Sequence, residues 1–363
     1  MRSSLLSLAR GAAGAAALLL FPFAASAHEV YVLTHDEIQH DIASPGFSWW
    51  SVIAADMHHF MFWAFIGILT VLVIFGISII RPLERALLPM FERMKPYAPH
   101  ISRITVGVAF LAGAWYQAAY GPELPLAANW GPYTPLITAV LVIVGGLMIA
   151  GLYVRTAALA ALALFAANVY FQGWYMLTYT NYLGEILVLL LIGAHGFHGA
   201  RTRHTEPGSW AERVARFSHK AKPYAFLILR VGFGVALFYA SFYAKFLHND
   251  LALDVAQGTG ILPTVVTHAY TVAQYLGFEP HFLVIGAGIV EFVIALFFIF
   301  GIEIRFTALF LEFWLALSLW YFGEVVWPHL ILIGIPIAFI FYGYDKYSIE
   351  GWLFKKRKME PVL

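Results

Sequence analysis

The stretch YAFLILRVGFGVALFYASFYAKF, residues 224–246, decides the class of this chain. It is almost entirely apolar, and a helix needs about 20 such residues to cross the hydrocarbon core of a membrane. Its two charged side chains, Arg230 and Lys245, lie toward its two ends. The whole chain has the same character, because 61% of its 363 residues are hydrophobic and only 12% are charged. Soluble domains carry about 25% charged residues. The sequence therefore predicts an all-α integral membrane protein.

Other apolar segments of similar length lie on both sides of this stretch. With it, they predict nine transmembrane helices, near 55–80, 104–120, 136–154, 157–177, 182–199, 224–246, 282–302, 306–322 and 329–344. Tryptophan and tyrosine residues cluster near many of the ends, as expected of side chains that lie at the membrane interface. The sequence thus indicates a multi-pass protein embedded in a lipid bilayer.

The basic residues fall on one side of this nine-span topology. They are Arg81, Arg85, Arg93, Lys95, Arg103, Arg155, Arg201, Arg203, Arg213, Arg216, Lys220, Lys222, Arg305, Lys346, Lys355, Lys356, Arg357 and Lys358. The positive-inside rule makes this side cytoplasmic, so the C-terminus is expected in the cytoplasm and the mature N-terminus outside it. The outer face instead carries nine of the 14 histidines: His28, His35, His40, His58, His59, His248, His268, His281 and His329.

The first 27 residues have the pattern of a secretory signal peptide. Arg2 and Arg10 supply the basic start, GAAGAAALLLFPFAA (11–25) the apolar stretch, and Ala25-Ser26-Ala27 a cleavage site. An uncleaved anchor helix is the alternative. Cleavage would make His28 the mature N-terminus, on the periplasmic side of a bacterial inner membrane.

After the first span, the chain repeats itself. The segment ISRITVGVAFLAGAWYQAAYGPELP (101–125) matches ILRVGFGVALFYASFYAKFLHNDLA (228–252), and GLYVRTAALAALAL (151–164) matches GIEIRFTALFLEFW (301–314). Each half also ends in a span closed by glycine, with His195-Gly196 set against Tyr342-Gly343. A duplication of four helices accounts for this pattern. We therefore divide the chain into a signal peptide (1–27), an exported segment with the first span and a basic loop (28–100), a first four-helix unit (101–200), a basic cytoplasmic linker (201–223), a second four-helix unit (224–345) and a basic tail (346–363).

The second unit resembles the DoxX family of four-helix membrane proteins. The residues that carry the resemblance are LRVGFGVALFYASFYAKF (229–246), IVEFVIALFFIFGIEIRFTALFLEFW (289–314) and IPIAFIFYGYD (335–345). The first unit resembles the family more weakly, because the position that matches Glu291 is apolar there. Some members of the family are membrane subunits of thiosulfate:quinone oxidoreductase, and others accompany thiol, methylamine or metal-related systems with no settled activity. The resemblance implies a quinone-linked redox subunit or accessory protein, with a soluble or membrane redox partner.

Lys245, Glu291 and Glu312 are ionisable residues inside predicted spans of the second unit. An isolated charge at the membrane centre costs about 2.5–3.5 kcal/mol on insertion scales, so we expect Lys245 to pair with Glu291, and Arg230 with Glu312. Such pairs admit two interpretations, a structural lock between helices or a quinone head-group site. The second needs a proton donor or acceptor beside aromatic walls, for which the candidates are Tyr239, Phe242, Tyr243, Trp314 and Trp320.

A histidine-rich N-terminal segment suggests a different function. The free amine and imidazole of His28 would together form a chelate of the kind that copper, which favours nitrogen donors, binds well. His35 or His40, with His58 or His59 from the motif Asp56-Met57-His58-His59, would complete a site. Copper is the first expectation and zinc the second. The alternative is an ordinary exported tail with interfacial histidines.

The sequence excludes several other chemistries. It contains no cysteine, which removes disulfides, thiol catalysis and cysteine-bound metals. It has no phosphate-binding loop, dinucleotide-binding fingerprint or nucleophile elbow, and no nucleic-acid partner is expected. Three functions stay open: a quinone-linked redox subunit, an extracytoplasmic copper-binding or copper-transport protein, and a structural membrane partner of a soluble enzyme. No residue identifies a reaction, so whether the chain is an enzyme also stays open.

Overall fold

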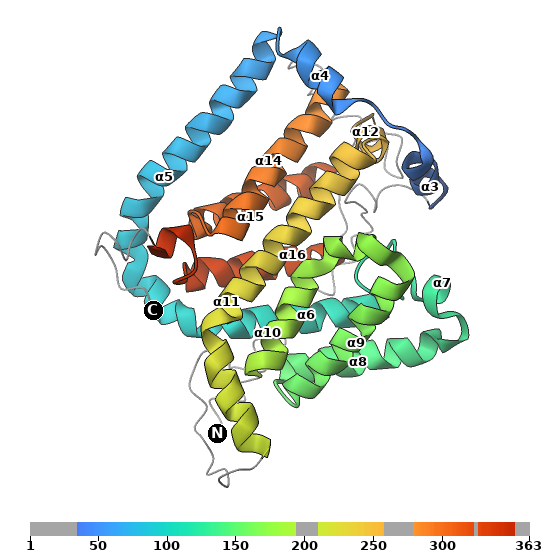
Figure 1. Cartoon of the computed structure of the whole chain (residues 1–363), viewed down its shortest axis with the longest axis vertical. Helices are drawn as coiled ribbons and strands as arrows, with labels where there is room; N and C mark the ends of the chain where they lie inside the picture. Colours follow the sequence, from blue (N-terminus) through green and yellow to red (C-terminus); the bar gives the residue numbers. More distant parts are fainter. Residues whose placement is uncertain (1–34, 194–209, 258–278, 323–325, 353–363) are drawn as a thin grey trace.

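The computed structural model describes residues 35–193, 210–257, 279–322 and 326–352, and throughout these ranges the regular structure is helical, as predicted (Figure 1). The N-terminal part contains α3 (His35–Ala43), α4 (Trp49–Asp56), α5 (Phe60–Met94) and η1 (Lys95–Tyr97). The first unit contains α6 (Ala98–Trp115), α7 (Leu126–Trp130), η2 (Gly131–Tyr133), α8 (Thr134–Ala150), α9 (Val154–Gln172), η3 (Gly173–Tyr179) and α10 (Thr180–Ile192). The second unit contains α11 (Trp210–Phe242), η4 (Tyr243–Leu247), α12 (Asp250–Gln257), α14 (Pro280–Phe300), α15 (Ile304–Phe322) and α16 (Val326–Tyr342).

Four helical stretches of the described chain are long and apolar enough to cross a membrane, Leu126–Ala150, Val154–Ile192, Ala215–Leu247 and Pro280–Phe300. A fifth is obtained if Trp49–Asp56 and Phe60–Gly76, which are bent by 98° relative to each other, count as one span. These helices suit a multi-pass protein in a lipid bilayer. Each of the nine predicted segments overlaps at least one helix. Several boundaries differ. The segment predicted near 55–80 is broken after Asp56, and its helix α5 continues to Met94, through the predicted basic loop. The segments predicted near 157–177 and 182–199 overlap the single stretch Val154–Ile192, and α11 begins at Trp210, inside the predicted linker.

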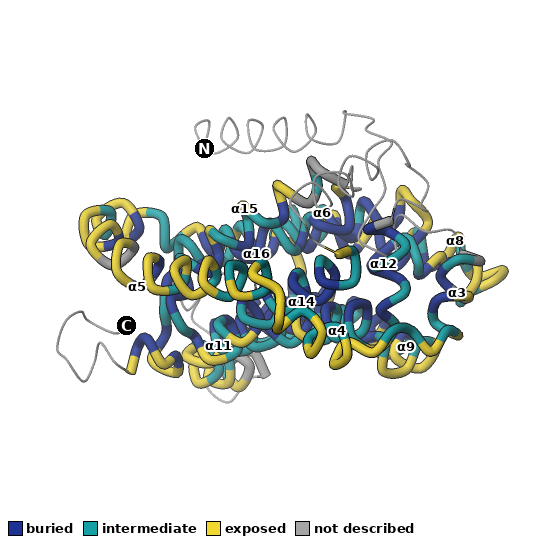
Figure 2. The backbone as a smooth tube through the Cα atoms, turned by 90° about the horizontal axis from the view of Figure 1, so that it is seen from above, coloured by how far each residue is buried: buried dark blue, intermediate teal, exposed yellow. Residues whose placement is uncertain are grey.

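The long helix α5 runs along one side of the molecule, and most of its residues are exposed (Figures 1 and 2). It contacts the second unit at several points along its length, two of which involve a close approach or a charge. Gly76 lies against the ring of Phe306, and the carboxylate of Glu84 lies 3.6 Å from the guanidinium of Arg305. The outward face of α5 is apolar, with Ile68, Val71 and Ile74 more than half exposed, which suits a helix surrounded by lipid.

The two units are built from the same helix contacts. Within the first, α6 packs against α8 and α9 against α10; within the second, α11 packs against α14 and α15 against α16. Between the units the packing is crossed, because α10 lies against α11 and α16 lies against α6. Most of the buried hydrophobic residues of both units belong to one continuous core.

A buried arginine holds the end of one helix in each unit. Arg103 of α6 donates hydrogen bonds to the carbonyl oxygens of Met148 and Ile149, at the end of α8. The last carbonyls of a helix have no partner within the helix, and a cation there is favourable. Gly151 follows with φ +71°, and a Cβ at this position would lie 3.0 Å from the guanidinium of Arg103. The second unit repeats this arrangement. Arg230 donates to the carbonyls of Phe298 and Ile299, and Gly301 follows with φ +68°.

A second arginine in each unit holds the end of the last helix. Arg155 donates to the carbonyls of Leu190 and Leu191, beside Gly193, and Arg305 donates to the carbonyl of Ile340, beside Gly343. The structure therefore pairs Gly193 with Gly343, and the sequence match of Gly196 with Gly343 is wrong by one helical turn. The spacing that the two units share is the one between the arginine and the glycine that it contacts, Arg155 to Gly193 and Arg305 to Gly343. The match to Gly196 relied instead on the aromatic or histidine residue that precedes the glycine.

The N-terminal segment is fastened to the second unit by its outer loop. Asn249 accepts a hydrogen bond from the backbone N–H of Phe47 (2.9 Å) and donates one to the Phe47 carbonyl (2.7 Å). Ser44 donates to the carboxylate of Asp250. Ile38 of α3 packs against Leu251 and Val255 of α12. The segment after α3 is thus held to the second unit by the Asn249 side chain, which bonds to both backbone polar groups of Phe47.

Candidate functional site

The intramembrane ion pair expected between Lys245 and Glu291 is present. The ammonium nitrogen of Lys245 lies 3.0 Å from Oε2 of Glu291. The lysine side chain is 5% exposed, whereas that of Glu291 is 21% exposed. The Glu291 side chain is therefore partly exposed at the surface of α14, a helix whose other residues are apolar or glycine apart from its first turn.

A local change in helix geometry positions the lysine. After Phe242, helix α11 continues as a π-helical turn, η4, which is closed by the hydrogen bond from the N–H of His248 to the carbonyl of Tyr243 (2.9 Å). Gly288 of α14 lies against this turn, and a Cβ there would come within 3.3 Å of Lys245 Cβ and 2.6 Å of the Phe246 ring. Glycine at 288 thus allows the close approach that brings Lys245 to Glu291. Single π-helical turns are rare and occur often at functional sites.

The aromatic wall beside the pair consists mainly of phenylalanines. Phe292 follows Glu291 in the chain, and its ring centroid lies 4.9 Å from that of Phe246 and 4.7 Å from that of Phe238. The ring centroid of Trp49, on α4, lies 5.8 Å from that of Phe246. Rings that meet edge to face or tilted in this way bury a large apolar area. The predicted Phe242 belongs to this wall, since its ring centroid lies 6.3 Å from those of Phe292 and Phe246, whereas Phe238, Phe246, Phe292 and Trp49 were not predicted.

Tyr243 and Trp314, predicted to line the site, lie elsewhere. The ring of Tyr243 contacts Tyr175 (5.2 Å) and His248 (4.6 Å) rather than the phenylalanine wall. Trp314 stacks with Phe310 of its own helix (6.4 Å), and within the described chain no ring contact joins it to Phe246 or Phe292. Helical spacing gave their depth in the membrane, but depth does not determine which way a side chain points.

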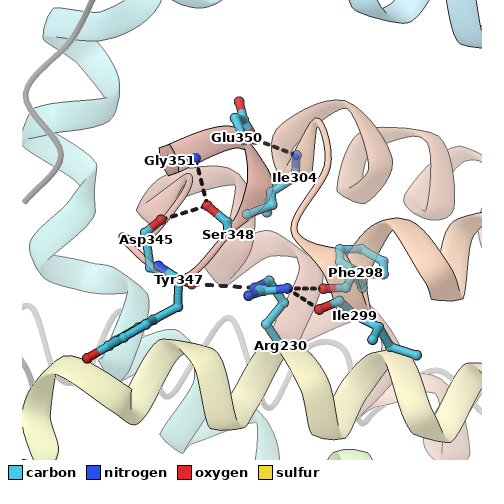
Figure 3. Close-up of polar contacts among 9 residues, drawn as sticks. All are labelled: Arg230, Phe298, Ile299, Ile304, Asp345, Tyr347, Ser348, Glu350 and Gly351. Atoms are coloured by element: carbon cyan, nitrogen blue, oxygen red, sulfur yellow. Dashed lines mark hydrogen bonds and ion pairs between the residues drawn. The ribbon is translucent and has the colours of Figure 1, made fainter. Parts of the chain in front are cut away.

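Arg230 pairs with Asp345, so the expected pair with Glu312 is a second correction. The Arg230 side chain is fully buried, its Nε lies 3.4 Å from Asp345 Oδ2, and its other bonds go to Phe298 and Ile299 (Figure 3). The segment after α16 continues this network, since Glu350 accepts from the N–H of Ile304 at the start of α15. These contacts explain Arg230 as a residue that joins α11, α14 and the segment after α16.

Glu312 stands apart from both pairs. It lies on α15, and its Oε1 is buried with no hydrogen-bond partner in the described part of the chain. Nothing in its surroundings brings it to Lys245 or Glu291. The predicted centre of three residues is therefore reduced to the pair formed by Lys245 and Glu291.

The histidines proposed as copper ligands are only partly described. His40, His58 and His59 are exposed, His35 begins α3, and His28 lies outside the described residues. Among the residues that the structure describes, no group of three histidine or acidic side chains is arranged to hold a metal ion. The copper site depends on His28 and stays a prediction.

A buried carboxylate in the first unit was missed by the sequence analysis. Glu185 of α10 is 1% exposed, accepts a hydrogen bond from the Ser102 hydroxyl, and lines a small cavity together with Arg103. The signal was present, because an ionisable residue inside a predicted span is a functional candidate by default.

A second, larger cavity of about 60 Å³ lies between the units and is lined by tyrosines. Tyr175, Tyr179 and Tyr182 contribute from one side, and Ala240 and Tyr243 from the other. The hydroxyls of Tyr175 and Tyr179 both donate to Glu123, which follows α6 in the chain. This cavity has room for a few water molecules but not for a large ligand, since each water needs about 10–15 Å³.

Comparisons of this chain with models of protein families, with curated proteins and with solved structures found no match.

Proposed function

We propose that this chain is a nine-span protein of a bacterial inner membrane, with a cleaved signal peptide, a periplasmic N-terminus and a cytoplasmic C-terminus. The support is twofold. All nine predicted segments overlap helices, and the 18 basic residues named above from the predicted loops, turns and tail fall on one side of this topology. The two sets of matching arginine–carbonyl contacts favour a duplication of a DoxX-like four-helix unit.

We further propose that the chain binds a quinone at Lys245 and Glu291, as a subunit or accessory of a redox complex. The observation that carries this proposal is the partly exposed Glu291 carboxylate paired with a buried lysine on an otherwise apolar helix. Ionisable side chains within a membrane are costly and usually functional. A lipid-soluble ligand that approaches from the bilayer reaches this pair without crossing the protein.

The chemistry of a quinone head group suits these side chains. The ring carries two carbonyl oxygens, and the Lys245 ammonium can donate a hydrogen bond to one of them. The rings of Phe246 and Phe292 provide an apolar surface for the quinone ring. Reduction of a quinone to a quinol takes two electrons and two protons. A separate redox protein would supply the electrons, and this chain supplies binding and a proton-exchanging carboxylate.

The test is quinone binding to the full chain, purified in detergent and titrated with a short-chain ubiquinone analogue while tryptophan fluorescence is followed. We expect Lys245→Met and Glu291→Gln each to weaken binding about tenfold to 100-fold, because each removes a hydrogen bond that involves a charged group. Glu84→Gln is the matched control, since Glu84 is also a buried, ion-paired glutamate but lies on α5.

An unchanged affinity in both variants, or no binding by the unmodified chain, would refute the proposal. The pair would then be a structural lock between η4 and α14. A menaquinone analogue run in parallel distinguishes a preference for one quinone class from a general affinity for aromatic rings.

A further inference from the structure

Four helices meet around Glu185. It lies on α10 where α6, α11 and α16 converge, and its carboxylate accepts a hydrogen bond from Ser102 of α6. An ionised carboxylate buried within a membrane protein is costly unless it is paired or takes up a proton. Arg103, the nearest cation, donates instead to the Met148 and Ile149 carbonyls, and its Nε has no hydrogen-bond partner in the described chain.

The fold does not need a carboxylate at this position. The crossing of α16 with α6 repeats that of α10 with α11, and the alignment that pairs Gly151 with Gly301 places Ile335 opposite Glu185 in the second unit. Similarly, the residue before Arg230 is Leu229, where Ser102 precedes Arg103. Ile335 and Leu229 are both buried. The first unit therefore carries a hydrogen-bonded acid between α10 and α6, whereas the matching positions of α16 and α11 in the second unit are apolar.

Two cavities lie along α10 on either side of this acid. The first, about 20 Å³, is lined by Glu185 and by residues toward the C-terminal end of α10, including Val188, Leu189 and Gly193. The second, about 60 Å³, is lined by Thr178, Tyr179, Asn181 and Tyr182 at the N-terminal end. Each is large enough for at least one water molecule.

Two buried tyrosine hydroxyls lie close to the N-terminal side of Glu185. Tyr182 precedes Glu185 by one helical turn, so the two side chains share a face of α10. The Tyr182 hydroxyl is buried without a hydrogen-bond partner in the described residues, and so is that of Tyr120, whose ring lies 4.9 Å from that of Tyr182. Buried hydroxyls are normally satisfied by protein or by ordered water. Beyond them, Tyr179 donates to Glu123, which follows α6.

We propose that these groups form a proton pathway along α10, between the two units, in which the side chain of Glu185 carries the proton. The carboxylate takes up one proton from water in one cavity, becomes a neutral acid and releases the same proton into the other cavity. Helix α10 spans roughly 20 Å, about two thirds of the hydrocarbon thickness. The pathway is a further activity, which does not depend on quinone binding.

The test is proton flux through the full chain reconstituted in liposomes of neutral lipid. A potassium gradient with valinomycin drives proton entry, a trapped pH-sensitive dye reports it, and no quinone is present. We expect the unmodified chain to conduct protons above protein-free liposomes, and Glu185→Gln to lower the protein-dependent flux by about 100-fold, as expected on removing a positioned proton-transfer group. Glu84 is a buried carboxylate of α5, and the Glu84→Gln variant should show the same proton flux as the unmodified chain.

A second variant keeps the proposal testable if Glu185→Gln does not reconstitute. Tyr182→Phe removes only a hydroxyl that has no hydrogen-bond partner among the described residues, so the packing of α10 is retained, and a lower flux is expected. Flux equal to that of protein-free liposomes in the unmodified chain would overturn the proposal. Unchanged flux in Glu185→Gln, or in Tyr182→Phe where Glu185→Gln cannot be measured, would overturn it as well. A failure of quinone binding leaves this result unaffected, because the assay contains none.

Discussion

Gly184 of α10 and Gly232 of α11 bring the two units into backbone contact, since a Cβ on Gly232 would lie 3.1 Å from Cα of Gly184 and 2.8 Å from the carbonyl oxygen of Thr180. The equivalent contact in the other crossing joins Gly334 of α16 to the Thr105 side chain of α6. Small residues at such contacts allow close helix packing in membranes, where apolar burial between helices contributes little.

Gly232→Ala should therefore destabilise the chain. The added methyl group meets backbone atoms that cannot move independently, so we expect a loss of about 1–3 kcal/mol, as for other overpacked sites. Thermal unfolding in detergent measures the change. Gly146→Ala in α8 is the control, because a Cβ there meets nothing within 4 Å. Equal melting temperatures for the two variants would show that the crossing tolerates separation.

Arg230→Met should destabilise the chain more strongly. It leaves Asp345 buried without its cation and removes the bonds to the end of α14, and breaking a buried ion pair costs about 3–5 kcal/mol. Chemical unfolding followed by circular dichroism tests this. Adding Asp345→Asn should restore part of the loss. The exposed Arg213→Met serves as the control, and a similar small effect in both arginine variants would contradict the structural role of Arg230.

Lys245→Met and Glu291→Gln should not have additive effects on stability. Residues in direct contact show interaction energies of about 0.5–3 kcal/mol, so the double variant should be more stable than the sum of the single changes predicts. A double-mutant cycle of thermal unfolding measures this energy. An interaction energy of zero would mean that the Lys245 and Glu291 side chains do not interact in the folded protein.

The docking of α3 on α12 should depend on pH through Asp41. Burial and the neighbouring carboxylates of Asp254 and Asp250 raise the pKa of Asp41 from 3.8 to about 6. Because this pKa is raised in the docked form, that form binds more protons between these two values. Docking is therefore strongest below about pH 4, weakens as the pH rises to about 6 and is weakest above that.

Hydrogen exchange of the α12 backbone amides at pH 5 and pH 8, corrected for the intrinsic pH dependence of exchange, measures this docking. We expect less protection at pH 8, and Asp41→Asn should give the same protection at both values. Neighbouring Glu37 and His40 of α3 are unchanged in this variant and provide an internal reference. If the unmodified chain is protected equally at both pH values, Asp41 does not control docking.

The mature N-terminus should retain copper if His28 and its amine bind it. After exposure to copper and extensive washing, the purified mature chain should hold about one copper per chain, and His28→Ala should hold none, because the free amine and imidazole act together. Elemental analysis measures the metal, and His219→Ala, an exposed histidine of α11, is the control. Equal copper in all three proteins would leave the N-terminus as an ordinary exported tail.

The positions of the helices could be predicted from the apolar segments, because the length and hydrophobicity of a segment decide whether it forms a membrane helix. The pairing of Lys245 with Glu291 could also be predicted, since a lysine near the outer end of one span can reach a glutamate about midway along the next. The same reasoning paired Arg230 with Glu312 wrongly. Whether two side chains meet depends on the faces that their helices present, and this depends on packing such as the contact at Gly288.

The arginine–glycine pattern shows a different limit. Matching Gly151 and Arg155 with Gly301 and Arg305 indicated a repeat. That these arginines bond to carbonyls at the end of another helix depends on how the helices pack, which the sequence match does not contain. The break in helix after Asp56 was invisible for a similar reason, because the residues Met57–His59 contain no proline or glycine to mark it.

The crossed packing of the two units has the form of a symmetric dimer joined into one polypeptide. In a dimer of identical subunits every interface residue occurs twice, so an acid at the position of Glu185 would appear in both crossings. Covalent fusion removes that constraint. The second unit can keep Ile335 and Leu229 as apolar packing residues, while the first unit acquires Glu185 and Ser102 and becomes reactive. The linked chain can thus place a reactive group in one half while the other half serves for packing alone.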